Sequence, residues 1–213
     1  FLTTRSGINK GMVTGDDILE VDTDGNIVIR NPQSAIRNYK PSTEFGMHLF
    51  IYQQRPDVNA VVHAHPVYAT GFAAARVPLT SCVFPEVIVG LGAIPLAEYA
   101  TPSTEEVAQS IAPFVNQTDA ILLANHGVVT YGKDLWDAYF KMEKVEHAAH
   151  ITFVAKMLGG EKLLSQEDIE KLRAISQQSY GKEFTEKISC VVSEMKEGNS
   201  EDVRKVIRQM LDA

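Results

Sequence analysis

The sequence contains few cysteines and no long apolar segment. Only two of its 213 residues are cysteine, Cys82 and Cys190, and no framework of further cysteines surrounds them. This usage is typical of a reducing compartment, and we expect a cytoplasmic protein. No apolar run approaches the roughly 20 residues that a membrane-spanning helix needs, so a membrane partner is not expected.

The chain also lacks an excess of positive charge. Lysine and arginine number 20 against 27 aspartate and glutamate residues, which gives a formal net charge of -7. Such a surface repels polyanions, so nucleic acid is not the expected partner, although a local pocket for one small phosphate is compatible with it. The 45% hydrophobic and 22% charged residues are ordinary for a globular domain with one sizeable core.

Hydrophobic periodicity and turn residues predict alternating strands and helices. The expected helices cover 45–54, 66–75, 134–158 and much of the chain after 165, and a further helix begins within 101–106. At that helix start, Ser103 and Glu106 have capping-box spacing. The expected strands are 27–29, 58–65, 87–89, 94–96, 120–124 and 128–131. This order predicts a layered α/β or α+β domain.

Two histidines stand at the end of one predicted strand, in Val61-Val62-His63-Ala64-His65. Residues i and i+2 of a strand project from the same face, so both imidazoles can reach one point. Neutral imidazole nitrogen is a good ligand for Zn²⁺, and three protein ligands leave a position for substrate. By itself the pair also fits two ordinary strand-end histidines.

His126 ends a second apolar strand and is followed by Gly127. The glycine permits a sharp break and a close approach of the chain to a bound group. Two buried strands that both end in histidine supply what a three-imidazole metal site requires. The alternative is a core histidine beside a turn.

Glu44 stands in the first turn of a predicted helix, after the hydroxyl residues Ser42 and Thr43. Free backbone N–H groups and the positive end of the helix dipole suit a phosphate there. A carboxylate near a metal and a substrate is a natural general base. Glu44 is equally explained as a favourable charge at a helix start.

These segments together resemble a known family. Pro41-Ser42-Thr43-Glu44, the His63-Ala64-His65 strand, Tyr99-Ala100-Thr101 and Asn125-His126-Gly127 occur in the order and spacing of the class II aldolase/adducin superfamily. The sequence is most similar to its L-fuculose-1-phosphate aldolase branch, over about residues 2 to 181. The resemblance implies a single α/β domain with a central, mostly antiparallel β-sheet flanked by helices.

The resemblance also implies the site. A Zn²⁺ ion, one per subunit, would be held by His63, His65 and His126, and other divalent metals would fit three imidazoles too. Glu44 would be a fourth resting ligand that moves to become the catalytic acid/base. Tyr180 would reach a neighbouring subunit's site as a proton donor, since such enzymes are typically homotetramers with sites at subunit interfaces.

The implied substrate is a small sugar phosphate whose phosphate group contacts Ser6, Gly7, Ser42 and Thr43. The implied reaction is the reversible cleavage of a short ketose or deoxy-ketose 1-phosphate, such as L-fuculose 1-phosphate or 5-deoxyribulose 1-phosphate, to dihydroxyacetone phosphate and an aldehyde. A metal ion would stabilise the enediolate as a Lewis acid.

Two departures from the family pattern keep other activities in view. Phe84 stands where the branch uses a tyrosine, which puts fuculose itself in doubt. Glu86 lies close to the position of a catalytic glutamate in related sugar-phosphate dehydratases, although it also fits a plain strand-entry carboxylate. The alternatives are therefore a dehydratase or 4-epimerase on the same metal site, or a non-enzymatic adducin-like scaffold.

The resemblance divides the chain into a catalytic domain, residues 1–181, and a C-terminal helical extension, residues 182–213. Phe1 is neither an initiator methionine nor the start of a signal-peptide pattern. We expect the family's N-terminal strand to precede it.

Overall fold

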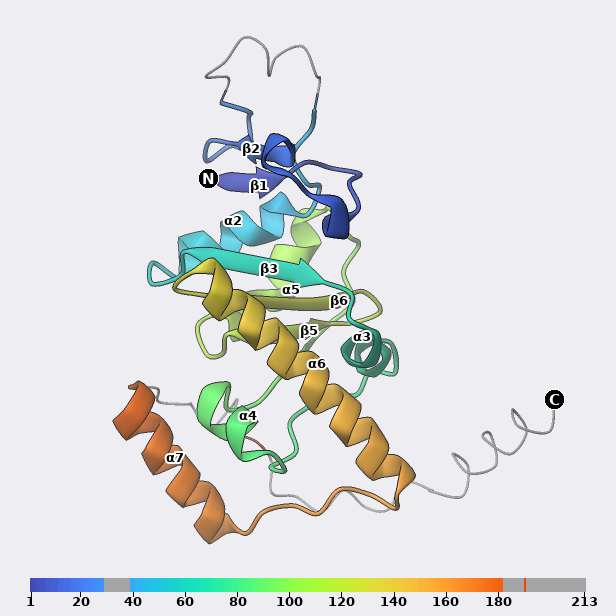
Figure 1. Ribbon diagram of the computed structural model, residues 1–213, viewed down its shortest axis with the longest axis vertical. Coiled ribbons are helices and arrows are strands. Elements are labelled where there is room, and N and C mark those ends of the chain that lie inside the picture. Colours follow the sequence, from blue (N-terminus) through green and yellow to red (C-terminus); the bar gives the residue numbers. More distant parts are fainter. Residues whose placement is uncertain (29–38, 182–189, 191–213) are drawn as a thin grey trace, which may run out of the picture.

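The computed structural model describes residues 1–28, 39–181 and 190 (Figure 1). Its central sheet has four strands in the order β3-β6-β5-β4. These strands are β3 (Ala60–Ala64), β4 (Leu96–Ala97), β5 (Ala120–Leu123) and β6 (Gly127–Gly132). The β3–β6 and β5–β6 pairs are antiparallel and the β4–β5 pair is parallel. The expected mostly antiparallel sheet is confirmed.

Helices cover both faces of this sheet (Figure 1). One face carries α3 (Val67–Ala74) and α6 (Leu135–Met157), and the other carries α2 (Phe45–Gln54) and α5 (Glu105–Val115). A small sheet of β1 (Leu2–Thr4) and β2 (Ile18–Glu20) lies beyond α2, with the short 3-10 helices η1 (Lys10–Met12) and η2 (Gly15–Asp17). The helices α4 (Pro85–Gly90) and α7 (Gln166–Tyr180) pack against each other away from that small sheet.

Strand alternation divides the core into two clusters. Ala120, Leu122 and Val128 pack toward α3 and α6, whereas Ile121 and Val129 pack toward α2 and α5. These strand residues are all buried, which explains why β5 and β6 read as continuous apolar runs.

Two local predictions were wrong. Residues 87–89 form the middle of helix α4 and not a strand, because Pro85 occupies the first helical position, where its fixed φ and missing N–H suit a helix start. Thr104, and not Ser103, caps α5: its side chain accepts a hydrogen bond from the Glu106 backbone N–H. Ser103 has a left-handed backbone instead, with φ 65°.

Cys82 and Cys190 form a disulfide, a pairing that the sequence did not predict. The two residues are buried beside Ile88 of α4 and Ile169 of α7. Among the helices that the structure describes, none has the length and apolar character needed to cross a bilayer. The expected strand 27–29 is reduced to a bridge between Val21 and Ile27, and Ile29 lies outside the described residues. So does the expected C-terminal extension, apart from Cys190.

Candidate metal centre

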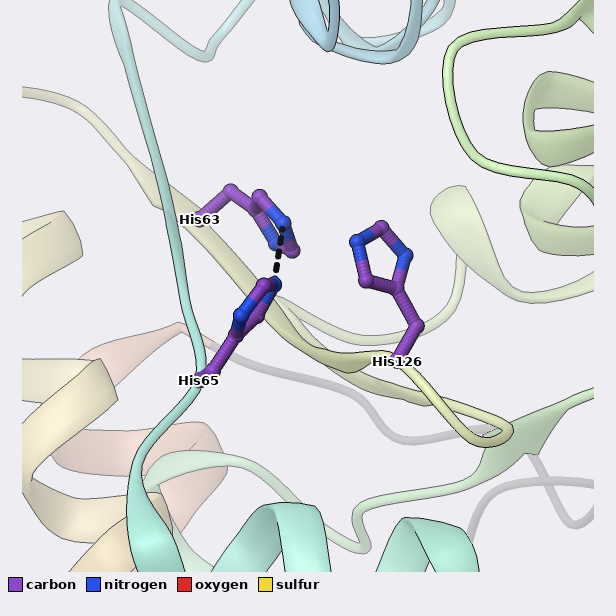
Figure 2. Close-up of side chains that lie close together, drawn as sticks. All are labelled: His63, His65 and His126. Atoms are coloured by element: carbon purple, nitrogen blue, oxygen red, sulfur yellow. Dashed lines mark hydrogen bonds between the residues drawn. The ribbon is translucent and has the colours of Figure 1, made fainter. Parts of the chain in front are cut away.

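The three histidines predicted from the sequence lie together at one end of the central sheet. His63 belongs to β3, His65 follows it, and His126 stands in the turn between β5 and β6. The strand period puts His63 on the same face as Val61, which packs toward α2 and α5. Figure 2 shows the three rings turned toward one another across the ends of the two strands.

Gly127 permits this approach of the strands. A Cβ atom there would lie 2.5 Å from Cδ2 of His65 and 2.6 Å from the carbonyl oxygen of Ala64. Any side chain would therefore displace His65 or the end of β3. The glycine after His126 is required by close packing between the two histidine-bearing segments.

A backbone hydrogen bond orients the ring of His63 within the cluster. Nδ1 of His63 lies 2.9 Å from the carbonyl oxygen of Val128, so Nδ1 carries the proton and Nε2 presents its lone pair. Nε2 of His65 lies 3.2 Å from Nε2 of His63 (Figure 2). One candidate ligand atom from each of the three histidines falls within 4.8 Å of the others.

This arrangement fits a divalent metal ion. Two imidazole nitrogens on one tetrahedral Zn²⁺ ion, each at about 2.0–2.1 Å, would stand roughly 3.3 Å apart. Burial lowers the pKa of His63 to about 3, and burial also lowers the pKa of His126. Both shifts keep the imidazoles neutral, which is the form that ligates metals.

Glu44 borders the cluster without belonging to it. It is the N-cap residue of α2, and its negative charge acts to raise the pKa of His126. Its Oε1 accepts a hydrogen bond of 3.0 Å from the hydroxyl of Ser103, whereas Oε2 is buried with no hydrogen-bond partner among the described residues. An unpaired buried carboxylate oxygen beside the histidine cluster fits the binding of a cation or a proton donor there.

The two segments predicted to bind phosphate lie side by side. The backbone N–H of Ser6 donates to the carbonyl of Lys40, and the N–H of Ser42 donates to the carbonyl of Thr4. Gly7 follows with φ 73°, a conformation that favours glycine. The structure thus brings Ser6 and Gly7 next to Ser42 and Thr43, which leads directly into Glu44 and α2.

Lys10 is a residue that the sequence reasoning missed. Its Nζ donates a 2.7 Å hydrogen bond to Oγ1 of Thr4, in the segment that leads to Ser6 and Gly7. Partial burial lowers the pKa of Lys10, and its positive charge helps to lower the pKa of His48. The sequence does not indicate this role for Lys10, because no spacing rule links the lysine to the histidines.

Two other candidates lie apart from the histidines. Tyr180 is the last residue of α7, which packs on α4 away from the strand ends that carry the cluster (Figure 1). Glu86 is an exposed residue in the first turn of α4 and is not among the side chains gathered round the histidines. The roles predicted for both stay predictions.

Known proteins resemble this chain over most of its length. Residues 1–153 match the family described as Class II Aldolase and Adducin N-terminal domain. An L-fuculose phosphate aldolase of Methanococcus maripaludis is 36% identical over 155 residues, 73% of this chain and 79% of that protein. A solved L-fuculose 1-phosphate aldolase has 36% identity and a TM-score of 0.69, covering 79% of this chain and 76% of its own.

Two further relatives carry other activities in their names. A 5-deoxy-D-ribulose 1-phosphate aldolase of Bacillus thuringiensis is 29% identical over 167 residues, 78% of this chain and 75% of that protein. A 3-oxo-tetronate 4-phosphate decarboxylase of Pectobacterium atrosepticum is 32% identical over 169 residues, 75% of this chain and 74% of that protein. The similar proteins therefore agree on phosphorylated substrates and differ in the reaction.

Proposed function

The chain belongs to the class II aldolase and adducin family, and we propose that it is a metal-dependent aldolase for a short ketose 1-phosphate. The observation that supports this most is the convergence of His63, His65 and His126 beside the unpaired carboxylate oxygen of Glu44. The proposed products are dihydroxyacetone phosphate and an aldehyde, as expected from L-fuculose 1-phosphate or 5-deoxyribulose 1-phosphate. The names of the L-fuculose phosphate aldolases and of the 5-deoxy-D-ribulose 1-phosphate aldolase among the relatives support these substrates.

The three histidines would hold one divalent ion, for which we propose Zn²⁺. When bound, the ion supplies Lewis-acid stabilisation to the negative charge that develops on the substrate oxygens. The neutral state of His63 and the proton on its Nδ1 leave Nε2 free for this purpose. No Schiff-base lysine is needed with such a site.

Glu44 and Tyr180 would move the protons. In the cleavage direction the hydroxyl on C4 loses its proton, the C3–C4 bond breaks, and C3 of the resulting enediolate gains a proton. We assign the proton at C3 to Glu44, whose Oε2 is buried and has no described partner. We assign the proton at the aldehyde oxygen to Tyr180 of a neighbouring subunit.

The substrate phosphate would bind where residues 4–7 and 40–43 run side by side. Ser6, Gly7, Ser42 and Thr43 can supply hydroxyl and backbone N–H donors there, close to the positive end of α2. Lys10 adds a cation bonded to the same segment through Thr4. This placement would hold the phosphate a short distance from Glu44.

A decarboxylase is the second candidate, because a relative of comparable identity carries that name. In that reaction CO₂ would leave in place of the aldehyde. The same metal could stabilise the resulting enediolate, and Glu44 could protonate it. The dehydratase and the 4-epimerase remain further rivals on this site, while an adducin-like scaffold would have no use for three converging histidines. Product analysis separates all of these.

The experiment is to incubate metal-reconstituted protein with L-fuculose 1-phosphate, ribulose 1-phosphate and their 5-deoxy analogues, and with 3-oxo-tetronate 4-phosphate. Release of dihydroxyacetone phosphate is followed with a coupled reductase, and CO₂ is measured in parallel. We expect metal-dependent release from at least one ketose phosphate, and a loss of about 100-fold or more in Glu44→Gln. Release of CO₂ together with dihydroxyacetone phosphate from 3-oxo-tetronate 4-phosphate, with no release from any ketose phosphate, would establish the decarboxylase.

We also propose a homotetramer. An exposed aromatic surface at the start of α6, formed by Trp136, Tyr139 and Phe140, supports self-association, since such surfaces are normally covered. Native mass spectrometry should give four times the chain mass. A monomer at micromolar concentration would contradict the proposal.

For the location we propose the cytoplasm, on the basis of the low cysteine content. The Cys82–Cys190 disulfide is more typical of an oxidising compartment. Whether the two cysteines are reduced in cells therefore distinguishes the cytoplasm from such a compartment. Alkylation of the protein during cell lysis should modify both cysteines. Protection of both would contradict a cytoplasmic location.

A further inference from the structure

The left-handed non-glycine residues of this fold gather at the candidate site. Among the described residues they are Arg76, Ser103 and Asn125, with φ values of 59°, 65° and 55°. Asn125 precedes His126, and its Oδ1 accepts a 2.9 Å hydrogen bond from Nε of Arg76. Ser103 contacts Glu44. Strained backbone of this kind is often found at functional sites, where the surroundings maintain it.

Ser103 is not needed to start helix α5. Thr104 caps that helix by accepting from the N–H of Glu106, and its hydroxyl donates to the carbonyl of Thr101 at 2.7 Å. The side chain of Glu106 in turn accepts from the N–H of Thr101. The local turn is therefore complete without Ser103, and glycine would adopt its backbone conformation without strain.

The hydroxyl of Ser103 instead reaches across 59 residues of sequence to Glu44, where it donates to Oε1 at 3.0 Å. The backbone N–H of Glu44 contacts Oγ of Ser42 at 3.3 Å, so both the backbone and one carboxylate oxygen are held. The other oxygen, Oε2, stays buried and without a partner among the described residues. The serine thus decides which of the two carboxylate oxygens is available.

We propose that Ser103 is a positioning residue for Glu44. The hydroxyl of Ser103 holds Oε1 of Glu44, so that Oε2 is the atom that exchanges a proton with the substrate. The inference rests on the proposed acid/base role of Glu44. In the reaction the proton moves between Oε2 and the substrate carbon, while the Ser103 hydroxyl keeps its own proton throughout. Loss of the hydroxyl leaves the carboxylate free to rotate.

Ser103→Gly is the most direct variant, because it removes the hydroxyl and relieves the left-handed strain at once. We expect kcat to fall about 10- to 100-fold, the loss typical of a residue that orients a functional group, with less than a twofold change in KM. The melting temperature should stay the same or rise. Ser103→Ala should lose the same activity without the gain in stability.

Thr104→Ala is the matched control, since Thr104 is the neighbouring hydroxyl residue and serves only the helix cap. It should lower the melting temperature and leave kcat unchanged. A merely structural Ser103 would give the reverse of our expectation: Ser103→Gly would retain full kcat. That result would overturn the inference while leaving the proposed aldolase intact.

A double-mutant cycle tests whether Ser103 acts through Glu44. In a Glu44→Gln background the effect of Ser103→Gly on kcat should disappear, because the carboxylate it orients is gone. An undiminished effect would overturn the inference. If wild-type protein released no product from any substrate, the proposed function would fail, and the infrared measurement below would still decide the contact.

Infrared spectroscopy provides a measurement independent of turnover. The difference between wild type and Glu44→Gln isolates the carboxylate band of Glu44 in the metal-free protein. Ser103→Gly should shift this band, because it removes a hydrogen bond to Oε1. An unshifted band would mean that the contact does not exist in solution.

Discussion

The two ends of strands β3, β5 and β6 contrast in how their polar groups are paired. At the end opposite the histidines, Asp119 lies 3.0 Å from Nη2 of Arg55 and 3.0 Å from Nζ of Lys141. Lys141 also pairs with Asp137, and Arg55 donates to the carbonyl of Val115. The charged side chains of this network satisfy one another and nearby backbone carbonyls.

The histidine end has few such partners. Oε2 of Glu44 is unpaired among the described residues, Nε2 of His63 and Nε2 of His65 contact only each other among the side chains of the cluster, and Ser103 and Asn125 have left-handed backbones. Satisfied polar groups account for the stability of a fold, whereas unsatisfied and strained groups have to be explained by something that binds there. The residues at the paired end therefore stabilise the sheet, whereas those at the histidine end form the proposed site.

Breaking the paired end should reduce stability and spare activity. Asp119→Ala removes the shared partner of Arg55 and Lys141, which keep Asp57 and Asp137, and loss of a hydrogen bond to a charged group costs about 1.5–3 kcal/mol of unfolding free energy. Urea unfolding measures this loss, and kcat of the folded fraction should be unchanged. Asp57→Ala, at a carboxylate that is 65% exposed, is the control and should cost at most about 1 kcal/mol.

A pair of glycine substitutions sharpens the contrast. Gly127→Ala should displace His65 and reduce activity about 100-fold, since a misplacement of about 1 Å can cost that much. Gly132→Ala, at the other end of β6, would put its Cβ against the carboxylate of Asp137 and should reduce stability by about 1–3 kcal/mol with little change in kcat. Equal activity losses in the two variants would contradict the division of the sheet.

The histidine end should also be the more sensitive to mild acid. Burial and the charge of Lys10 lower the pKa of His48 to about 4, below the value of about 6.5 for an unfolded chain. The unfolded state then binds more protons between these values, so stability is full above about pH 6.5 and is lost as the pH falls toward 4. At the opposite end Arg55 lowers the pKa of Asp57, so that ion pair survives until lower pH.

Between pH 7 and pH 5 the metal-free wild-type protein should lose unfolding free energy, and His48→Gln should make this loss smaller by about 1–2 kcal/mol. Unfolding free energies at pH 7 and pH 5 measure it. His63, whose pKa is lowered to about 3, and His126, whose pKa is also lowered by burial, contribute in the same direction. An identical pH dependence in His48→Gln and wild type would show that His48 is not buried in the neutral form.

Much of the sheet and the histidine cluster could be predicted because both follow short-range rules. The two-residue period of a strand placed His63 and His65 on one face, and the glycine after His126 indicated a close approach. The long helix expected over 134–158 is found as α6, from Leu135 to Met157, with Asp134 as its cap.

The features that were missed depend on contacts between distant segments. The hydrogen bond from Ser103 to Glu44 joins residues 59 positions apart, and the Cys82–Cys190 disulfide spans 108 positions. Neither leaves a periodic signal. The error at 87–89 has a local cause, since a run of β-branched residues suggested a strand although Pro85 favours a helix start.

The most direct test of the central claim is a calorimetric titration of chelator-treated protein with Zn²⁺. We predict a single tight site per chain, retained in Asp57→Ala and lost in His126→Gln, because only the latter removes a ligand from the histidine end. Binding should also raise the melting temperature of the wild-type protein. Absence of a tight site, or one that His126→Gln leaves intact, would contradict the account.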